Sequence, residues 1–392
     1  MKRKMILGLT VVAILMVILG CNKKDNTSER GEGSKTSSIR VQYNPESDFE
    51  AEPVNGGQSV RITNYLGDKW EVNIPLKIQN LPVTHIGSNA FQRKNLIKVV
   101  IPDGVIEIEY NAFAENQITN IIIPNSVTII NVGAFERNQL TNINIPNNVT
   151  YLSGFANNQL TSVTIPNSVT EIGYNAFYGN ELTSIVLGNN VNNIEQDAFS
   201  FNQLTNLNIP NSVTSIGQNA FYSNQLTSVI IPNSVTFIGN EAFRSNQLTN
   251  VNISNGVIEI GRSAFENNKL INVIIPDSVI SIGQNAFSEN QLISVTIPNN
   301  ITSIEQNTFA YNKLVSVIIP DNIAIRGGAF IDNQITSITI GANVVISHTG
   351  GGSSGYRDLA FENGFFNIYR SNGRSAGSYT RSDINSETWI KN

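Results

Sequence analysis

Cysteine and histidine are almost absent from this chain. Its 392 residues include one cysteine, Cys21, and two histidines, His85 and His348. A lone cysteine cannot form a disulfide within one chain, and the two histidines flank a long repeated region, so they cannot share one site. Acidic pairs such as Glu195 and Asp197 have no nucleophile and no set of metal ligands beside them. The sequence therefore predicts no enzyme, no metal site and no cofactor.

Positive charge is also scarce. Lysine and arginine number 25 against 30 aspartates and glutamates, and loss of residues 1–20 would remove three basic residues and change the formal charge from −5 to −8. A mildly acidic chain without a basic stripe is not expected to bind nucleic acid or to dock directly on anionic lipid. No glycine-rich phosphate loop opens a helix, so no small-molecule substrate is expected either.

What the chain does contain is one unit that recurs many times. Residues 224–243 read Asn-Gln-Leu-Thr-Ser-Val-Ile-Ile-Pro-Asn-Ser-Val-Thr-Phe-Ile-Gly-Asn-Glu-Ala-Phe. The final phenylalanine returns every 22 residues, with one step of 20 and one of 21, at Phe91, Phe113, Phe135, Phe155, Phe177, Phe199, Phe221, Phe243, Phe265, Phe287, Phe309 and Phe330. A fixed period of this length is typical of a solenoid, whose neighbouring repeats bury a common core.

Each unit opens with a strand signal. Val229 and Ile231 alternate with outward residues, and Pro232 ends the strand because it has no N–H to donate. Strands separated by a return path of about 16 residues must be parallel, since antiparallel neighbours need tight hairpins. Seven apolar positions per unit are expected to point inward: Leu226, Val229, Ile231, Val235, Ile238, Ala242 and Phe243. We predict a right-handed solenoid of about 12 repeats, with a parallel β-sheet on one face and short extended and 3-10 segments on the other.

An asparagine follows each repeat phenylalanine by three residues. It stands at Asn116, Asn138, Asn158, Asn180, Asn202, Asn224, Asn246, Asn268, Asn290, Asn312 and Asn333. Stacked at one strand spacing, its amide can donate to and accept from neighbouring turns. We expect a structural ladder of asparagines that satisfies buried turn backbone.

The repeat pattern resembles a known family. Leu-x-x-Val-x-Ile-Pro-x-Ser-Val-Thr-x-Ile-Gly-x-Asn-Ala-Phe is similar to the leucine-rich repeat of BspA-like bacterial surface proteins, including the Treponema pallidum type, from about Val60 to about Val345. Many relatives carry cysteine in the turn where this chain has asparagine. The resemblance implies a surface-exposed binding or adhesion protein and leaves its ligand open.

The first residues are typical of a secretion address. Lys2-Arg3-Lys4 precedes an apolar run from Met5 to Leu19, which predicts a signal peptide at residues 1–20. Cys21 stands where a bacterial lipobox places its lipid-modified residue, so we expect a lipid anchor at this position; the alternative is an ordinary signal peptide with an incidental cysteine. Residues 21–48 are polar and predict a flexible spacer. The expected location is the bacterial cell envelope, on the outer-membrane surface.

Three further segments complete the predicted organisation. Residues 49–91 are expected to form an N-terminal cap and opening coil, residues 92–346 the leucine-rich-repeat solenoid, and residues 347–392 a C-terminal cap. In that cap, Phe365–Tyr369 and Ala376–Thr380 flank an Asn-Gly turn and predict a hairpin anchored by Trp389. A separate aromatic ligand site is the alternative.

The open face of the sheet is the predicted binding site. Candidate ligand-binding residues project from the strands: Val100, Ile122, Asn144, Thr164, Val186, Asn208, Ser228, Ile230, Asn250, Asn252, Ile274, Thr296 and Ile318. Exposed valine and isoleucine among hydroxyls and amides favour a protein ligand, although β-branched residues also simply suit a half-exposed sheet. We therefore expect a cell-surface lipoprotein whose concave sheet face binds a host or neighbouring-cell protein. The alternative is a structural envelope component that makes lateral protein–protein contacts.

Overall fold

The computed structural model describes residues 42–346, 360–361 and 364–392. Residues 42–392 form one compact unit. The predicted signal peptide, Cys21, His348 and most of the predicted spacer lie outside the described residues.

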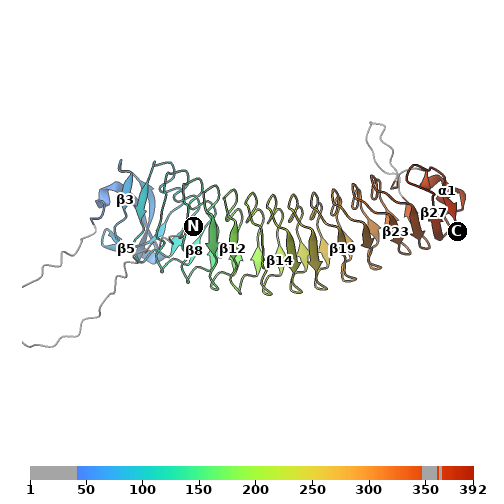
Figure 1. The fold of residues 1–392 in the computed structure, drawn as a ribbon. Coiled ribbons are helices and arrows are strands. Elements are labelled where there is room, and N and C mark those ends of the chain that lie inside the picture. Colours follow the sequence, from blue (N-terminus) through green and yellow to red (C-terminus); the bar gives the residue numbers. More distant parts are fainter. Residues whose placement is uncertain (1–41, 347–359, 362–363) are drawn as a thin grey trace, which may run out of the picture. The chain divides into compact units, whose positions relative to one another are not determined.

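The described chain is a β-solenoid of about 13 turns of roughly 22 residues (Figure 1). Each coil crosses the stack twice, once through the Leu-x-x-Val-x-Ile stretch and once through the Thr-x-Ile stretch of the return path. We call these the front and the back of the coil. The predicted repeat solenoid is confirmed.

The back of the coils carries a long parallel ladder. Its strands are β5 (Leu81–Ile86), β7 (Glu107–Ile108), β8 (Ile129–Ile130), β9 (Tyr151–Leu152), β11 (Glu171–Ile172), β13 (Asn193–Ile194), β14 (Ser215–Ile216), β16 (Phe237–Ile238), β18 (Glu259–Ile260) and β20 (Ser281–Ile282). A second ladder continues with β22 (Ser303–Ile304), β24 (Ala324–Ile325) and β26 (Val345–Ile346). These short extended pieces, which the sequence predicts only as a connection, hold the stack together.

The front strands pair mostly two by two. They are β3 (Glu71–Asn73), β6 (Lys98–Val100), β10 (Ser162–Thr164), β12 (Ser184–Val186), β15 (Ser228–Ile231), β17 (Asn250–Ile253), β19 (Asn272–Ile274), β21 (Ser294–Thr296), β23 (Ser316–Ile319) and β25 (Ser337–Ile340). The pairs are β3–β6, β10–β12, β15–β17, β19–β21 and β23–β25. The predicted parallel sheet is therefore present on the front face, but as separate strand pairs rather than as one continuous ladder. Because the back ladder and the asparagines already join each coil to the next, the stack does not depend on a continuous front.

The segment expected to form a 3-10 turn has a different backbone. In the coil that ends at Phe221, Tyr222 N–H donates to Asn219 O at 3.0 Å and Asn219 has a left-handed φ of 54°. Equivalent left-handed residues recur in neighbouring coils, for example Asn175 and Asn285. A left-handed residue interrupts a right-handed helical turn, so the chain makes tight turns here instead.

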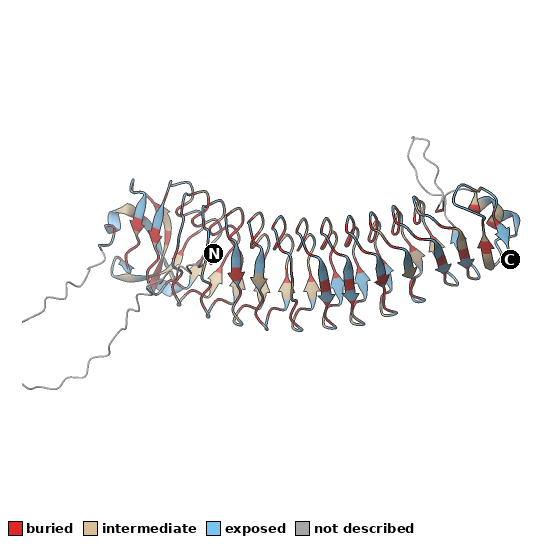
Figure 2. Ribbon diagram, viewed as in Figure 1, coloured by how far each residue is buried: buried red, intermediate tan, exposed pale blue. Residues whose placement is uncertain are grey.

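The core lies inside the coils, where buried residues recur from one coil to the next, as Figure 2 marks in red. All seven inward positions predicted for the unit at 224–243 are buried, with at most 3% of any residue exposed. From Phe91 to Phe361 the successive phenylalanine rings stack with centroids 4.9 to 5.7 Å apart. Each repeat thus supplies one layer of a continuous apolar core.

A hairpin covers the N-terminal end of the core. β1 (Phe49–Val54) pairs antiparallel with β2 (Ser59–Tyr65), which joins β5, while β4 (Lys77–Ile78) also pairs with β5. Two 3-10 turns, η1 (Glu46–Asp48) and η2 (Asn55–Gly57), border β1. Asn44 is buried and its N–H donates to Asn73 O at 2.9 Å. The predicted spacer therefore extends too far, because its last residues pack on this cap.

The C-terminal end is closed by a helix and an added pair of strands. Residues Phe365–Ser371 form α1, so the predicted hairpin is wrong in its first arm. Phe365 and Tyr369 are both buried at the i, i+4 spacing of a helix face, which explains the difference. β27 (Gly377–Thr380) pairs antiparallel with β25 and with β28 (Ile390–Lys391). Trp389 is buried beside Phe365, with ring centroids 5.2 Å apart, as expected of an anchor.

Candidate protein-binding face

The front of each coil presents one central outward residue, and we call this series the front column. Val229 and Ile231 of β15 are buried, so Ile230 between them points away from the core. The same alternation recurs in the other front strands. The apolar members are strongly exposed: Ile122 80%, Val186 59%, Ile230 65%, Ile274 77% and Ile318 67%.

The predicted ligand-binding residues lie together on this one surface. Asn144, Thr164, Asn208, Asn252 and Thr296 are the exposed polar members of the front column. Ser228 and Asn250 are exposed two residues earlier on their strands and lie opposite each other in the β15–β17 pair. The sequence therefore places these side chains correctly with respect to exposure.

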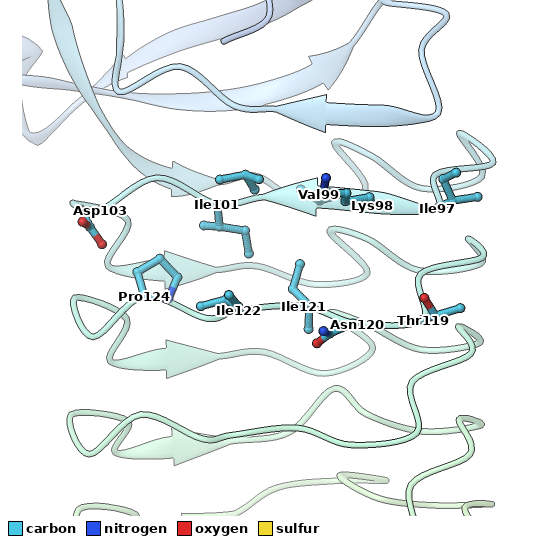
Figure 3. A pocket seen from close by; sticks show the side chains of 11 residues that line it. Ile97, Lys98, Val99, Ile101, Asp103, Thr119, Asn120, Ile121, Ile122 and Pro124 are labelled. Atoms are coloured by element: carbon cyan, nitrogen blue, oxygen red, sulfur yellow. The ribbon is translucent and has the colours of Figure 1, made fainter. Parts of the chain in front are cut away.

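Val100 is the exception, because it is half-buried beside a hollow of about 340 Å³. Figure 3 shows the hollow between β6 and the next front stretch, with Ile97, Ile101, Ile122 and Pro124 among its lining residues. The 119–124 stretch joins no described strand pair. The hollow therefore lies where the front sheet is interrupted.

Charge is absent from much of this face. The front column and the residue two positions before it on each strand carry no charged side chain from Asn142 to Thr339, although 14% of the whole chain is charged. Lys98 lies outside this stretch and its Nζ pairs with Glu71 at 3.4 Å. The surface is therefore apolar and hydrogen-bonding rather than ionic.

The sequence reasoning missed a second row of exposed apolar residues. Ile271, Ile293 and Val315 are 45%, 49% and 48% exposed, and they occupy the position after the repeat leucine, where most coils have threonine. Ile293 N–H donates to Ile271 O at 3.0 Å, which places these two in adjacent layers. Their departure from the repeat consensus was the available signal.

Aromatic side chains gather away from this face, at the turn that follows the phenylalanine stack. The rings of Tyr178, Phe201 and Tyr222 meet edge to face, with centroids 5.3 and 5.1 Å apart. Edge-to-face packing of this kind is a favourable arrangement between neighbouring rings. The cluster supports the turn edge and adds no ring to the front column.

The titratable groups of the described residues do not converge on a catalytic site. His85 Nδ1 lies 2.8 Å from Thr84 Oγ1, and its Nε2 lies 3.8 Å from Glu107 Oε2. On the back ladder, burial raises the pKa of Glu195 above its ordinary value and the nearby Glu171 carboxylate raises it further. No group of three or more metal-ligating side chains occurs within the residues described here.

These features define a leucine-rich-repeat solenoid, a fold that is typically a non-catalytic interaction scaffold. The family model described as "BspA type Leucine rich repeat region (6 copies)" matches residues 72–156, 153–249 and 236–349. The chain therefore belongs to the BspA-type leucine-rich-repeat family, as the repeat pattern predicts.

The chain is similar to solved structures of bacterial leucine-rich-repeat proteins. A leucine-rich cell surface protein from Faecalibacterium prausnitzii is 26% identical, with a TM-score of 0.50, and the match covers 75% of this chain and 87% of that one. A leucine-rich-repeat protein from Bacteroides ovatus is 21% identical over 76% and 88%, with a TM-score of 0.44. The T. pallidum leucine-rich-repeat protein is 21% identical over 63% and 89%, with a TM-score of 0.25.

Two further searches point to no additional property of the chain. No curated protein sequence matches the chain. Within the described residues there is no helix of the length and apolar character that crossing a membrane requires.

Proposed function

We propose that the protein is a lipid-anchored protein of the bacterial cell surface whose front face binds another protein, on a host or a neighbouring cell. The observation that carries the proposal is the front column, in which five valine and isoleucine side chains are more than half exposed on an uncharged sheet. Exposed apolar surface of this extent is typical of interaction sites. The Faecalibacterium prausnitzii relative, described as a cell surface protein, supports the location.

The test places charge on the front column. Ile230→Lys together with Ile274→Lys in residues 42–392 should lower partner binding at least about tenfold, because two buried lysines would lose hydration at the interface. Both side chains are mostly exposed, so the melting temperature should stay within about 2 °C. The matched control is Ile258→Lys with Ile280→Lys, which changes exposed isoleucines at the back of the coils and should leave binding unchanged.

Binding is measured against host matrix and plasma proteins, fibronectin and fibrinogen included, and against the immobilised chain itself. Saturable binding that the front variant removes and the back variant keeps supports the proposal. Binding that survives the front variant, or silence across all these proteins with the chain shown to be folded, contradicts it.

A further inference from the structure

The front column alternates between branched apolar and short polar residues over nine successive coils. Its members are Thr164, Val186, Asn208, Ile230, Asn252, Ile274, Thr296, Ile318 and Thr339. The strand registers place Ile230 beside Asn252, Ile274 beside Thr296, and Ile318 beside Thr339. The face is therefore a row of apolar projections separated by shallower polar positions.

We propose that this strip binds a second copy of the same chain, packed face to face with its projections interleaved. The inference rests on the proposed function, because it names the partner of that same face. A copy on a neighbouring cell, or beside it on the same cell, presents the same strip.

The spacing of the projections favours a second copy over a helical partner. Strands about 4.8 Å apart place the apolar projections about 9.6 Å apart, whereas an α-helix repeats a side-chain position every 10.5 Å or so. Over the three steps from Val186 to Ile318 that difference accumulates to about 3 Å, enough to lose the match. Another copy of the chain has an identical repeat, so its projections stay in step along the whole strip.

The charge distribution limits contact between two copies to the uncharged front face. Between residues 101 and 346 there are 17 acidic and 6 basic side chains, which gives a formal charge of −11. Two such bodies repel each other wherever their acidic surfaces meet. The front column from Thr164 to Thr339 and its flanking serines and asparagines are uncharged, and the flanking side chains can hydrogen-bond with those of the partner copy.

Symmetry then limits the register to two-fold axes across the stack that fall between an apolar and a polar coil, and the proposed dimer uses the one that opposes the eight coils from Val186 to Thr339. A two-fold axis parallel to the stack would set each coil against its own equivalent, so isoleucine would meet isoleucine. A two-fold axis across the stack, between Asn252 and Ile274, closes the dimer with projections and polar positions opposed. The opposed pairs are Val186 with Thr339, Asn208 with Ile318, Ile230 with Thr296, and Asn252 with Ile274.

The small size of the strip predicts a dimer of low affinity. Eight coils from Val186 to Thr339 make a strip about 35 Å long and about 10 Å wide, which is less than the roughly 800 Å² per partner of a standard interface. Self-association should therefore be concentration-dependent. It would be strengthened where many copies share a surface.

The test exchanges one projection and one polar position across the predicted two-fold axis. Thr296→Ile fills the position that receives Ile230, and Ile230→Thr removes the projection, so each should weaken self-association at least about tenfold because each change occurs twice in the dimer. The double variant restores one projection opposite one threonine. Its self-association constant should recover to within about threefold of that of the unmodified chain. Thr302→Ile is the matched control, since it makes the same substitution on the back of the same coil.

Sedimentation equilibrium of residues 42–392 from about 1 to 500 µM covers the affinity range expected of a small interface. Weakening by each single variant, recovery in the double variant and no effect of Thr302→Ile support the proposal. Stronger association of Thr296→Ile would mean that the strip is merely adhesive apolar surface, and failure of the double variant to recover would exclude the interleaved register; either overturns the proposal.

A chain that stays monomeric across this range also overturns it, and the proposed function is then decided separately. If a host protein binds and the Ile230→Lys, Ile274→Lys variant loses it, the protein-binding face stands with a different partner. If neither self-association nor host binding occurs, both proposals fall.

Discussion

The side-chain amide of Asn224 joins two coils through Phe199, whose carbonyl oxygen lies 2.9 Å from Asn224 Nδ2. The same nitrogen donates to Phe221 O at 3.2 Å, and Asn224 Oδ1 accepts the Leu204 N–H at 3.0 Å. Equivalent bonds occur from Asn116 to Asn333. The asparagine ladder predicted from the repeat is therefore confirmed as a buried network that ties each turn to its neighbour.

Removing one of these amides should be costly. Asn224→Ala leaves the Phe199 and Phe221 carbonyls and the Leu204 N–H without this partner in a buried site. We expect a loss of about 2–4 kcal/mol in the free energy of unfolding, since each unsatisfied buried group costs about 1–3 kcal/mol. Chemical denaturation measures it. Gln225→Ala, at the exposed neighbouring position, should change stability by less than about 0.5 kcal/mol, and equal effects of the two changes would contradict the ladder's role.

Loss of one ring from the phenylalanine stack should destabilise the chain at least as much as loss of one asparagine amide. Phe221 is fully buried between Phe199 and Phe243, with ring centroids 5.5 and 5.4 Å away. Phe221→Ala should destabilise the chain by about 3–5 kcal/mol, because it opens a cavity in the middle of a one-dimensional stack. Phe201→Ala removes a ring that is 45% exposed and should cost much less. Comparison of the two denaturation midpoints and slopes tests this, and a small loss for Phe221→Ala would be the contrary result.

The raised pKa of Glu195 predicts that replacing this residue with a neutral one stabilises the folded chain, by an amount that depends on pH. Burial, and then Glu171, raise its pKa in the folded chain, so the folded state disfavours the ionised form and loses stability as the pH rises through this group's titration. Glu195→Gln should therefore raise the melting temperature at pH 7 by up to about 2 °C, a small effect because the group is half-exposed and screened.

A second measurement at acidic pH is the control for this variant. At about pH 4, below the ordinary carboxyl pKa, Glu195 is largely protonated and the gain from glutamine should disappear. Thermal melts of both chains at the two pH values decide the matter. A gain that is larger in acid than at neutral pH would reverse the predicted sign.

The lipid anchor remains a prediction at Cys21. Cys21→Ser in the full chain should abolish metabolic labelling with palmitate. It should also release the protein from the membrane fraction, because the acyl groups on Cys21 are expected to supply its membrane affinity. Protease treatment of intact cells then reports display: degradation of the solenoid in the unmodified protein indicates an outward position. Labelling that persists in Cys21→Ser would place the modification elsewhere, and full protection from protease would favour the envelope-component alternative.

Several features of the fold follow from the sequence because they repeat. A 22-residue period with a phenylalanine and an asparagine at fixed positions leaves few ways to bury both, so the stack, its inward residues and its amide ladder could be predicted from local pattern alone. The exposure of Ile230 and Ile274 followed from strand alternation around buried neighbours. Phe365 and Tyr369 show the limit of such reasoning, because five residues outside the repeat fit a strand or a helix about equally well.

The tertiary structure decided how the coils are joined and what their surfaces offer. The sequence of one unit does not say that the back stretch, as at Ser215–Ile216, carries the long ladder while the front strands pair two by two, because hydrogen-bond registry depends on all coils at once. Ile271, Ile293 and Val315 each depart visibly from the repeat consensus, but only the stacked coils show that they are exposed and form one row. The repeat by itself determined the stack, whereas contacts between repeats decided how its strands pair and which side chains gather on its surface.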